Sequence, residues 1–274
     1  MIAVIQLRFG WSIPFWPSAA IAGAWLLYIN GWRHIRQSKL ALPEWRALCF
    51  TLGLSTLWFA LSSPLDSLDD VLLTAHMAQH FLLMSVAPPL IVLGAPVLPI
   101  LHGVPRLALP IIAGIFRLRI FHSIARAVVD PVIAWIAMNT AYIFWHVPQA
   151  FELALHSENW HNLEHLCFFW TSVAFWWVVI QPQQSRQPTS RWMLVPYLLA
   201  ADIVNTIVSA FLVFSGRVLY STYAQAPRVC RLDALSDQIA AGAAMWVLGS
   251  IIFLGFAIPI LYRSLSSRLS TSIA

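Results

Sequence analysis

Charged side chains are scarce in this sequence: they make up 10% of its 274 residues, whereas hydrophobic side chains make up 59%. Soluble domains carry about 25% charged residues, so the chain lacks the polar coat that water requires, and a soluble domain is excluded. The 14 tryptophans agree with this conclusion, because tryptophan gathers at membrane interfaces. In such a protein the placement of the positive charges matters more than the net charge of +5, and we expect no nucleic-acid partner.

Other features that would indicate familiar chemistry are also missing. The three cysteines, Cys49, Cys167 and Cys230, are far apart and form no CxxC pair. Glycine is too sparse for a phosphate-binding loop, and no GxSxG, HExxH or Walker sequence occurs. Residues 1–8 lack a charged start, an apolar run and a small-residue cleavage site, so we expect no cleaved signal peptide. The sequence therefore gives no indication of an enzyme.

Long apolar runs dominate what is present. Runs of about 20 apolar residues can cross the hydrocarbon core of a bilayer, and they lie near 15–32, 45–61, 71–101, 131–145, 160–180, 193–214 and 238–261. The third run is over-long and contains Pro88, Pro89 and Pro96, so we expect it to kink or end early. The sequence predicts an all-α membrane protein, a bundle of seven transmembrane helices that forms a single domain over residues 1–274.

Lysine and arginine are sorted between alternate connections. Twelve of them lie on one predicted side: Arg33, Arg36, Lys39, Arg46, Arg106, Arg117, Arg119, Arg126, Arg186, Arg191, Arg263 and Arg268. Only four, Arg8, Arg217, Arg228 and Arg231, lie on the other. Because cytoplasmic loops carry the excess of positive charge, we predict an N-terminus outside and a C-terminus in the cytoplasm.

Histidines recur at helical spacing where two of these spans begin. His76, His80 and Met84 follow one another at intervals of four residues, and His161 and His165 repeat that interval. Side chains four residues apart lie on the same side of a helix. Both spans are predicted to enter from outside, so we expect the two pairs to meet just below the outer surface.

Two further segments are predicted to reach the same face. His146 ends the fourth span, and the seventh begins with Asp237 and Gln238 and reaches Met245 two turns later. Imidazole binds copper, zinc and iron, and a methionine sulfur favours Cu(I). We therefore predict a copper site, with these residues as its candidate ligands: His76, His80, His161, His165, His146, Asp237, Met245 and Met84.

Three groups near or within the spans have other candidate roles. Glu164 and Gln238 are expected to orient the ligand rings from outside the ligand set. Asp202, with Asn205, lies near the middle of the sixth span, where an ionisable residue is either functional or bonded to a neighbouring helix. His34, His102, His122 and His156 are expected in loops, exposed to solvent. Met84 and Met245 are also residue types that fill helix cores.

At these residues the sequence resembles a known family. The run HMAQHFLLMSVAPPLIVLGAP from His76 to Pro96 resembles the signature of the CtaG family, assembly factors for caa-type cytochrome c oxidase. The stretches WHVP (145–148), FWW (175–177) and DQIAAGAAMW (237–246) support it and follow in the right order. The similar region covers residues 16–261, and it carries over the roles of His76, His80, His146, His161, His165, Asp237 and Met245.

The resemblance implies a seven-helix protein of the bacterial inner membrane that helps to mature a haem–copper oxidase by supplying copper. Its implied partners are the oxidase subunits, a periplasmic copper donor and membrane lipid; a homo-oligomer is left open. Three alternatives also stay open: a b-type haem protein with histidine ligands on two helices, a metal-free assembly scaffold, and a copper importer. Import is the weakest, because no convincing polar residues continue below Asp202 and Asn205.

Overall fold

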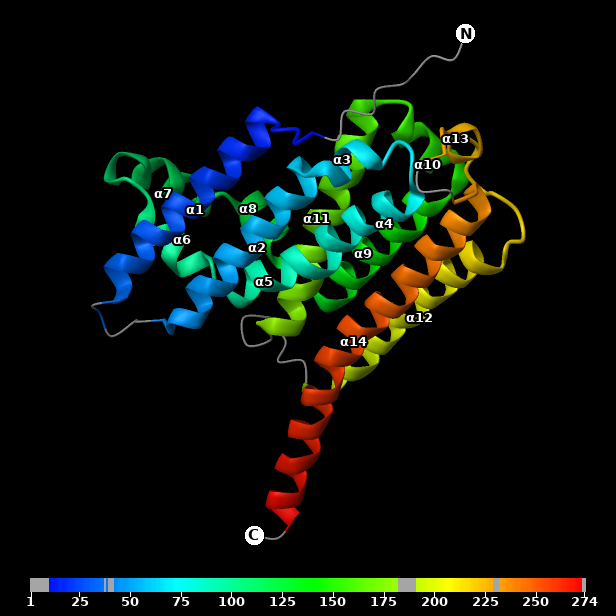
Figure 1. Ribbon diagram of the computed structural model, residues 1–274. Helices are drawn as coiled ribbons and strands as arrows, with labels where there is room; N and C mark the ends of the chain where they lie inside the picture. The colour runs from blue at the N-terminus through cyan, green and yellow to red at the C-terminus, as the bar shows by residue number, and fades with distance from the viewer. Residues whose placement is uncertain (1–9, 37, 39–41, 182–190, 229–231, 273–274) are drawn as a thin grey trace.

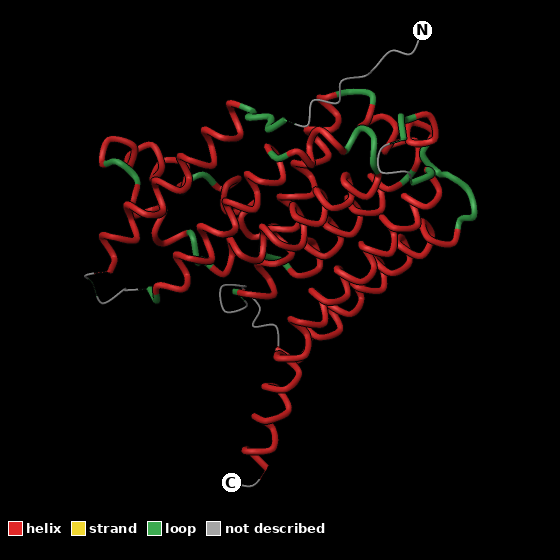
Figure 2. The backbone as a smooth tube through the Cα atoms, viewed as in Figure 1, coloured by secondary structure: helices red, strands yellow, loops and turns green. Residues whose placement is uncertain are grey.

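The computed structural model describes residues 10–36, 38, 42–181, 191–228 and 232–272, and every regular element in these ranges is a helix. The helices are α1 (Phe15–Arg36), α2 (Glu44–Ser62), α3 (Pro64–Leu68), α4 (Leu73–Phe81), α5 (Ala87–Leu93), α6 (Val97–Gly103), α7 (Leu109–Arg117), α8 (Arg119–Val128), α9 (Pro131–His146), α10 (Pro148–Leu155), α11 (Glu158–Ile180), α12 (Leu194–Phe214), α13 (Ser221–Gln225) and α14 (Ala234–Ser272), with a π-helical turn at Leu82–Val86 and 3₁₀ turns at Arg106–Ala108 and Arg191–Met193. The all-α prediction is confirmed, and Figures 1 and 2 show the helices gathered into one bundle.

Five helical segments are long and apolar enough to cross a membrane: Glu44–Leu68, Leu73–Leu93, Glu158–Ile180, Leu194–Phe214 and Ala234–Ser266. Two bent pairs, α6 with the segment Arg106–Arg117 (105°) and α8 with α9 (71°), raise the count to seven if each forms one broken span. The chain is therefore a membrane protein, while seven spans and the direction of insertion stay predictions. Residues 1–8, Lys39, Arg186, Cys230 and Arg231, on which some sequence arguments depend, lie outside the described residues, as does the side chain of Arg268.

The region between residues 97 and 128 differs from the connection that the sequence suggested. It forms α6, α7 and α8, and none of the residues of α7 or α8 is buried. His102 and His122 consequently lie in helices rather than loops, as does His34 in α1, although all three are exposed as expected. Helix α6 packs so closely on α1 that a Cβ added at Gly31 would lie 1.7 Å from the carbonyl oxygen of Pro99.

The over-long third run departs from a regular α-helix next to Pro88 and Pro89 and ends before Pro96. It forms α4, the π-helical turn and α5 as one span, which ends at Leu93 before Ala95 adopts a positive φ of 48°. Pro88 has no N–H to donate to the carbonyl of Met84 four residues earlier, and the indole N–H of Trp176 donates to that carbonyl instead, at 2.9 Å. A side chain of α11 thus bonds the carbonyl that Pro88 leaves without its helical partner. An unbonded carbonyl inside a membrane bundle would be costly.

Helix α4 and its continuation form the centre of the bundle. The span Leu73–Leu93 has 61% of its apolar window buried, more than any of the other four segments. Helix α14 has the smallest buried share of the five segments, 22%. It has 39 residues, about 58 Å at 1.5 Å per residue, and its C-terminal part projects beyond the bundle (Figure 1). Polar side chains on α4 are therefore enclosed by neighbouring helices.

Candidate metal centre

Two neighbouring helices, α14 and α2, fix the position of α4. At its start, the carboxylate of Asp237 on α14 accepts hydrogen bonds from the backbone N–H groups of Leu73 (2.7 Å) and Thr74 (3.2 Å). In its middle, the side-chain amide of Gln79 donates to the carbonyl of Ala60 at 2.9 Å. The first turn of a helix leaves N–H groups without partners, and Asp237 satisfies two of them. The histidines of α4 thus stand on a fixed backbone.

Two helices contribute a compact group of possible ligands, the four-residue cluster of His76, His80, His161 and Glu164. One nitrogen or oxygen from each residue lies within 4.8 Å of all the others. The interval of four residues on α4 and of three on α11 places each pair on one side of its helix. The pairs face each other, and the rings of His76 and His161 stack with centroids 5.4 Å apart.

The polar atoms of the cluster are enclosed without hydrogen-bond partners. His76 and Glu164 are fully buried and His80 is 3% exposed. Both ring nitrogens of His76 and of His80, both carboxylate oxygens of Glu164 and Nε2 of His161 have no partner among the described residues. A buried polar group without a partner costs about 1–3 kcal/mol, so seven such atoms in one place make this cluster a candidate for binding a cation.

The spacing of these atoms fits a single ion. His80 Nε2 lies 3.7 Å from Glu164 Oε1, which is too long for a hydrogen bond. Two ligands about 2.0–2.1 Å from a tetrahedral ion are themselves about 3.3 Å apart, close to the observed separation. Imidazole nitrogens with one carboxylate oxygen suit a transition ion such as zinc, copper or iron. The cluster could therefore hold one metal ion with little movement.

Two more residues flank the cluster. The ring of His165 lies 4.2 Å from that of His161 and 5.5 Å from that of His80, and its Nε2 is also unpartnered. Asp69, which precedes α4, is 2% exposed, and its Oδ2 lies 3.7 Å from His161 Nε2. Either residue could enter the coordination of an ion at the cluster.

An acidic vestibule leads to this group from the end of the bundle where α4 and α11 begin. It is a hollow of about 430 Å³ lined by Asp66, Asp69, Asp70 and Glu158 together with His161 and His165. Burial is the main reason that the pKa of Asp69 rises to about 8, and the carboxylates of Asp70 and Asp66 raise it further. At neutral pH Asp69 therefore mostly keeps its proton, and the other acidic groups around this concave opening are the ones that raise the local concentration of cations.

The structure does not bring every candidate into the cluster. Both carboxylate oxygens of Asp237 bond to the start of α4, as described above, and Gln238 bonds to the loop after α12 through Leu212, Ser215, Arg217 and Leu219. Asp202 accepts a 2.8 Å hydrogen bond from Ser250 on α14. Asn205 accepts a hydrogen bond from Tyr142 and donates one to the carbonyl of Met245. These four residues connect helices and loops.

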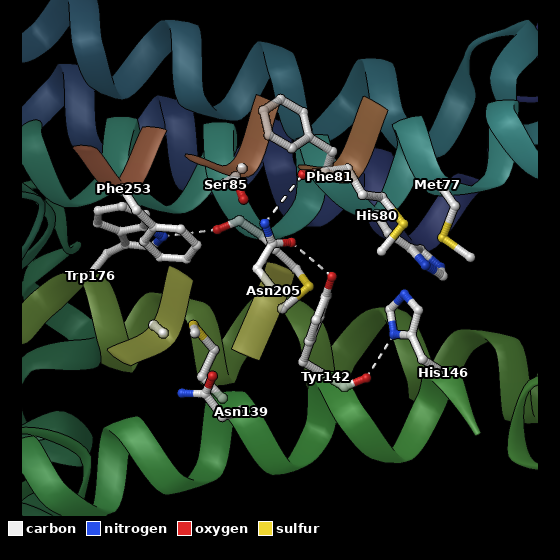
Figure 3. Close-up of a pocket in the computed structure, with 15 residues that line it drawn as sticks. Met77, His80, Phe81, Ser85, Asn139, Tyr142, His146, Trp176, Asn205 and Phe253 are labelled. Carbon is white, nitrogen blue, oxygen red and sulfur yellow. Dashed lines mark hydrogen bonds between the residues drawn. The ribbon is translucent and has the colours of Figure 1, made fainter. Parts of the chain in front are cut away.

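His146, Met84 and Met245 lie deeper, around a separate cavity that also reaches His80 (Figure 3). His146 is the last residue of α9, and its Nδ1 lies 2.7 Å from the carbonyl oxygen of Tyr142. Met77 and Met138 line the same cavity. We refer to it below as the methionine cavity.

Sequence reasoning missed part of this arrangement. Glu164 was expected to support a ligand ring from outside, yet its carboxylate lies within the cluster. Asp69, Met77 and Met138 are not among the candidates that the sequence suggests. The position of Met77 beside His76 gave one signal for a sulfur-rich site, but Met138 stands alone in its span.

Comparison with known proteins gives one match. The model of the Caa3_CtaG family, described as cytochrome c oxidase caa3 assembly factor, matches residues 26–267 of this chain. That region contains the cluster, the acidic residues of the vestibule and the methionine cavity. No curated protein and no solved structure shows significant similarity to the chain.

Proposed function

This chain belongs to the Caa3_CtaG family of cytochrome c oxidase assembly factors, and we propose that it serves assembly as a membrane copper chaperone. In this role the four-residue cluster holds Cu(I) and releases it to the copper centre of the oxidase. The protein acts as a carrier and not as an enzyme. Its proposed location is the bacterial inner membrane, with the cluster near the outer face.

One observation carries the proposal: seven buried nitrogen and oxygen atoms of His76, His80, His161 and Glu164 lack hydrogen-bond partners within the described part of the chain. Such a group is expensive in an empty protein interior and is stabilised by a bound cation. A metal-free scaffold would keep this cost with no gain. Ligand atoms within 4.8 Å of one another also suit one ion better than a haem, whose macrocycle would have to fit between the two helices.

Copper is favoured among the possible ions by the surroundings of the cluster. Imidazole alone would suit zinc, copper or iron, but thioether sulfur selects Cu(I), and methionines line the cavity that His80 also reaches. The acidic vestibule would draw the cation toward His161 from the adjoining surface. Transfer to an oxidase subunit in the same membrane then needs no soluble carrier, and a periplasmic donor could load the vestibule.

The proposal is tested in a strain that lacks the protein and is grown with limiting copper. We expect reduced haem–copper oxidase activity and reduced copper in the purified oxidase, with partial recovery on added copper. A gene carrying both His80→Ala and His161→Ala should fail to restore activity, whereas His102→Ala, on an exposed histidine, should restore it fully. An oxidase with normal copper content in the deletion strain would overturn the chaperone role.

A further inference from the structure

The methionine cavity lies inside the bundle next to the four-residue cluster. Its volume is about 50 Å³, and α4, α9, α11, α12 and α14 all contribute to its wall. A volume of about 10–15 Å³ is enough for one water molecule, so a single metal ion has room there. His80 lines the cavity and also belongs to the cluster.

Sulfur is concentrated at this place. The chain has six methionines, and four of them line the cavity: Met77, Met84, Met138 and Met245. They come from three different helices and the π-helical turn. Methionine often fills irregular gaps in a core, so the thioethers alone would not establish a binding site. A second feature of the wall points to a ligand.

That feature is an imidazole nitrogen with nothing to bind. The Nδ1 of His146 lies 2.7 Å from the carbonyl oxygen of Tyr142, which fixes Nδ1–H as the donor and leaves a lone pair on Nε2. His146 is 7% exposed, and its Nε2 has no partner among the described residues. Figure 3 shows the His146 ring extending toward His80 and Met77. A backbone bond of this kind is how proteins orient a metal-binding histidine.

The amide side chains of the wall have partners. The Asn205 side chain bonds to Tyr142 and to the Met245 carbonyl, and the Asn139 amide donates to the Trp135 carbonyl at 2.8 Å. Among the described residues that line the cavity, His80 and His146 are the only ones with fully buried polar side-chain atoms that lack a partner. The possible metal-binding atoms without hydrogen-bond partners are thus the imidazole nitrogens of His80 and His146, which share this cavity with the methionine thioethers.

We propose that the methionine cavity is a second metal site, specific for Cu(I), which exchanges its ion with the four-residue cluster through His80. The inference rests on the proposed function, because it takes the cluster as the first copper site. Transfer between the two sites exchanges one set of ligands for another and leaves the ion as Cu(I), so it needs no oxidant or reductant. The two sites differ in selectivity: nitrogen and carboxylate ligands accept zinc, whereas thioethers favour Cu(I) and its analogue Ag(I).

The test counts bound ions and identifies their ligand atoms. Purified protein is loaded with Cu(I) under a chelator that limits free copper, and X-ray absorption distinguishes sulfur from nitrogen and oxygen neighbours. The wild-type protein should bind two Cu(I) ions with both kinds of neighbour. The variant Met77→Leu/Met84→Leu/Met245→Leu nearly conserves volume and leaves Met138 as the remaining thioether of the cavity. It should lose most of the sulfur neighbours of Cu(I) and bind Ag(I) at least tenfold more weakly than the wild type.

A complementary variant separates the two sites. His161→Ala/Glu164→Gln should keep one Cu(I) with sulfur neighbours and should still bind Ag(I). If the triple methionine variant does not fold, Met245→Leu alone should weaken Ag(I) binding at least tenfold. Wild-type protein with two Cu(I) ions but no sulfur neighbour would overturn the methionine site and leave the cluster intact. A single Cu(I) with sulfur neighbours, unaffected by His161→Ala/Glu164→Gln, would overturn the cluster as a copper site instead.

Discussion

Asp237 on α14 accepts a 2.7 Å hydrogen bond from the backbone N–H of Leu73, the first residue of α4, although 164 residues separate the two. The other carboxylate oxygen accepts from Thr74 through both its N–H and its hydroxyl group. A residue that the sequence suggested as a metal ligand is therefore fully engaged in holding the helix that carries His76 and His80. Its role in the structure is to hold the start of the helix that carries these candidate ligands.

Replacing Asp237 should consequently affect stability more than metal stoichiometry. Loss of a helix-capping side chain costs about 0.5–2 kcal/mol, and hydrogen bonds to charged groups about 1.5–3 kcal/mol. We expect Asp237→Ala to lower the melting temperature of the purified protein, and Asp237→Asn to recover part of it. Both variants should keep the number of bound copper ions. An unchanged melting temperature with complete loss of copper would identify Asp237 as a ligand.

Substitutions in the cluster should remove metal. His80→Ala and His161→Ala should each lose most of the copper bound at this site, because each removes a ligand of the enclosed ion. Replacing a residue outside the ligand set typically weakens metal binding by about 10–100-fold. Glu164→Gln should weaken binding by more than this. Equilibrium competition with a chelator measures these affinities, and His122→Ala, at an exposed histidine on α8, should bind as the wild type does. Full occupancy after combined loss of His76, His80, His161 and His165 would exclude the site.

The contact between α1 and α6 gives a test of packing. A Cβ at Gly31 would meet the Pro99 carbonyl at 1.7 Å, whereas a Cβ at Gly23, on the same helix, would have nothing within 4 Å. Gly31→Ala should destabilise the protein by about 1–3 kcal/mol, the usual cost of overpacking. Gly23→Ala should be neutral or slightly stabilising, since alanine is the better helix former. Equal unfolding profiles of the two variants in detergent would show that α6 does not pack on α1 in this way.

Glu152 on α10 should make stability depend on acid pH. Partial burial acts to raise its pKa, but hydrogen bonds from Thr222 and Ser221 outweigh burial and hold the pKa below its ordinary value of 4.5. Because the folded state favours the ionised carboxylate, its contribution is complete above pH 4.5 and is lost as the pH falls through the lower, folded-state pKa.

The measurement compares melting temperatures of wild type and Glu152→Gln between pH 3 and pH 7. The variant should be less stable near neutrality, and the difference should shrink as the pH drops below 4.5. His156→Ala serves as a control, because that imidazole is 69% exposed in its side chain and exposed ion pairs contribute little. A difference that grows with acidification would contradict this role of Glu152.

Reporter fusions should establish the direction of insertion. Fusions after Arg119 and after Arg263 should report cytoplasm, and fusions near Asp66 and Ser157 should report the outside. These positions follow from the twelve-to-four division of basic residues. A cytoplasmic signal at Asp66 and Ser157 would place the vestibule on the inner face and remove the proposed route from a periplasmic donor.

The site was predictable in outline because two local patterns carried most of it. The interval from His76 to His80 and from His161 to His165 specified one side of each helix, and the family resemblance supported the same residues. The rotation of α11 about its axis could not be deduced in this way. Glu164 and His165 are adjacent on that helix, and only packing against α4 decided that Glu164 completes the four-residue cluster.

Long-range contacts explain what the sequence did not reveal. Nothing near Asp237 in the sequence indicates Leu73 as its partner, and Trp176 gives no local sign of bonding to the Met84 carbonyl. Likewise, the run between 97 and 128 contains apolar and basic residues in mixture, so its three helices depend on contacts with α1 and α9 or with lipid. Hydropathy predicted the main spans because it needs only the local composition.

The π-helical turn at Leu82–Val86 has a genetic consequence. Such a turn contains an extra residue relative to a regular helix, and one residue corresponds to a rotation of about 100°. Deleting a single codon there would let the helix become regular with little rotation of α5 against α4, because the wider turn already absorbs the rotation that its extra residue would add. Ile91 and Gly94, which contact Gly53 and Phe50 of α2, would then keep facing α2 while His76 and His80 kept their places. The turn thus lets this span carry one extra residue without changing the phase between the half with His76 and His80 and the half that packs on α2.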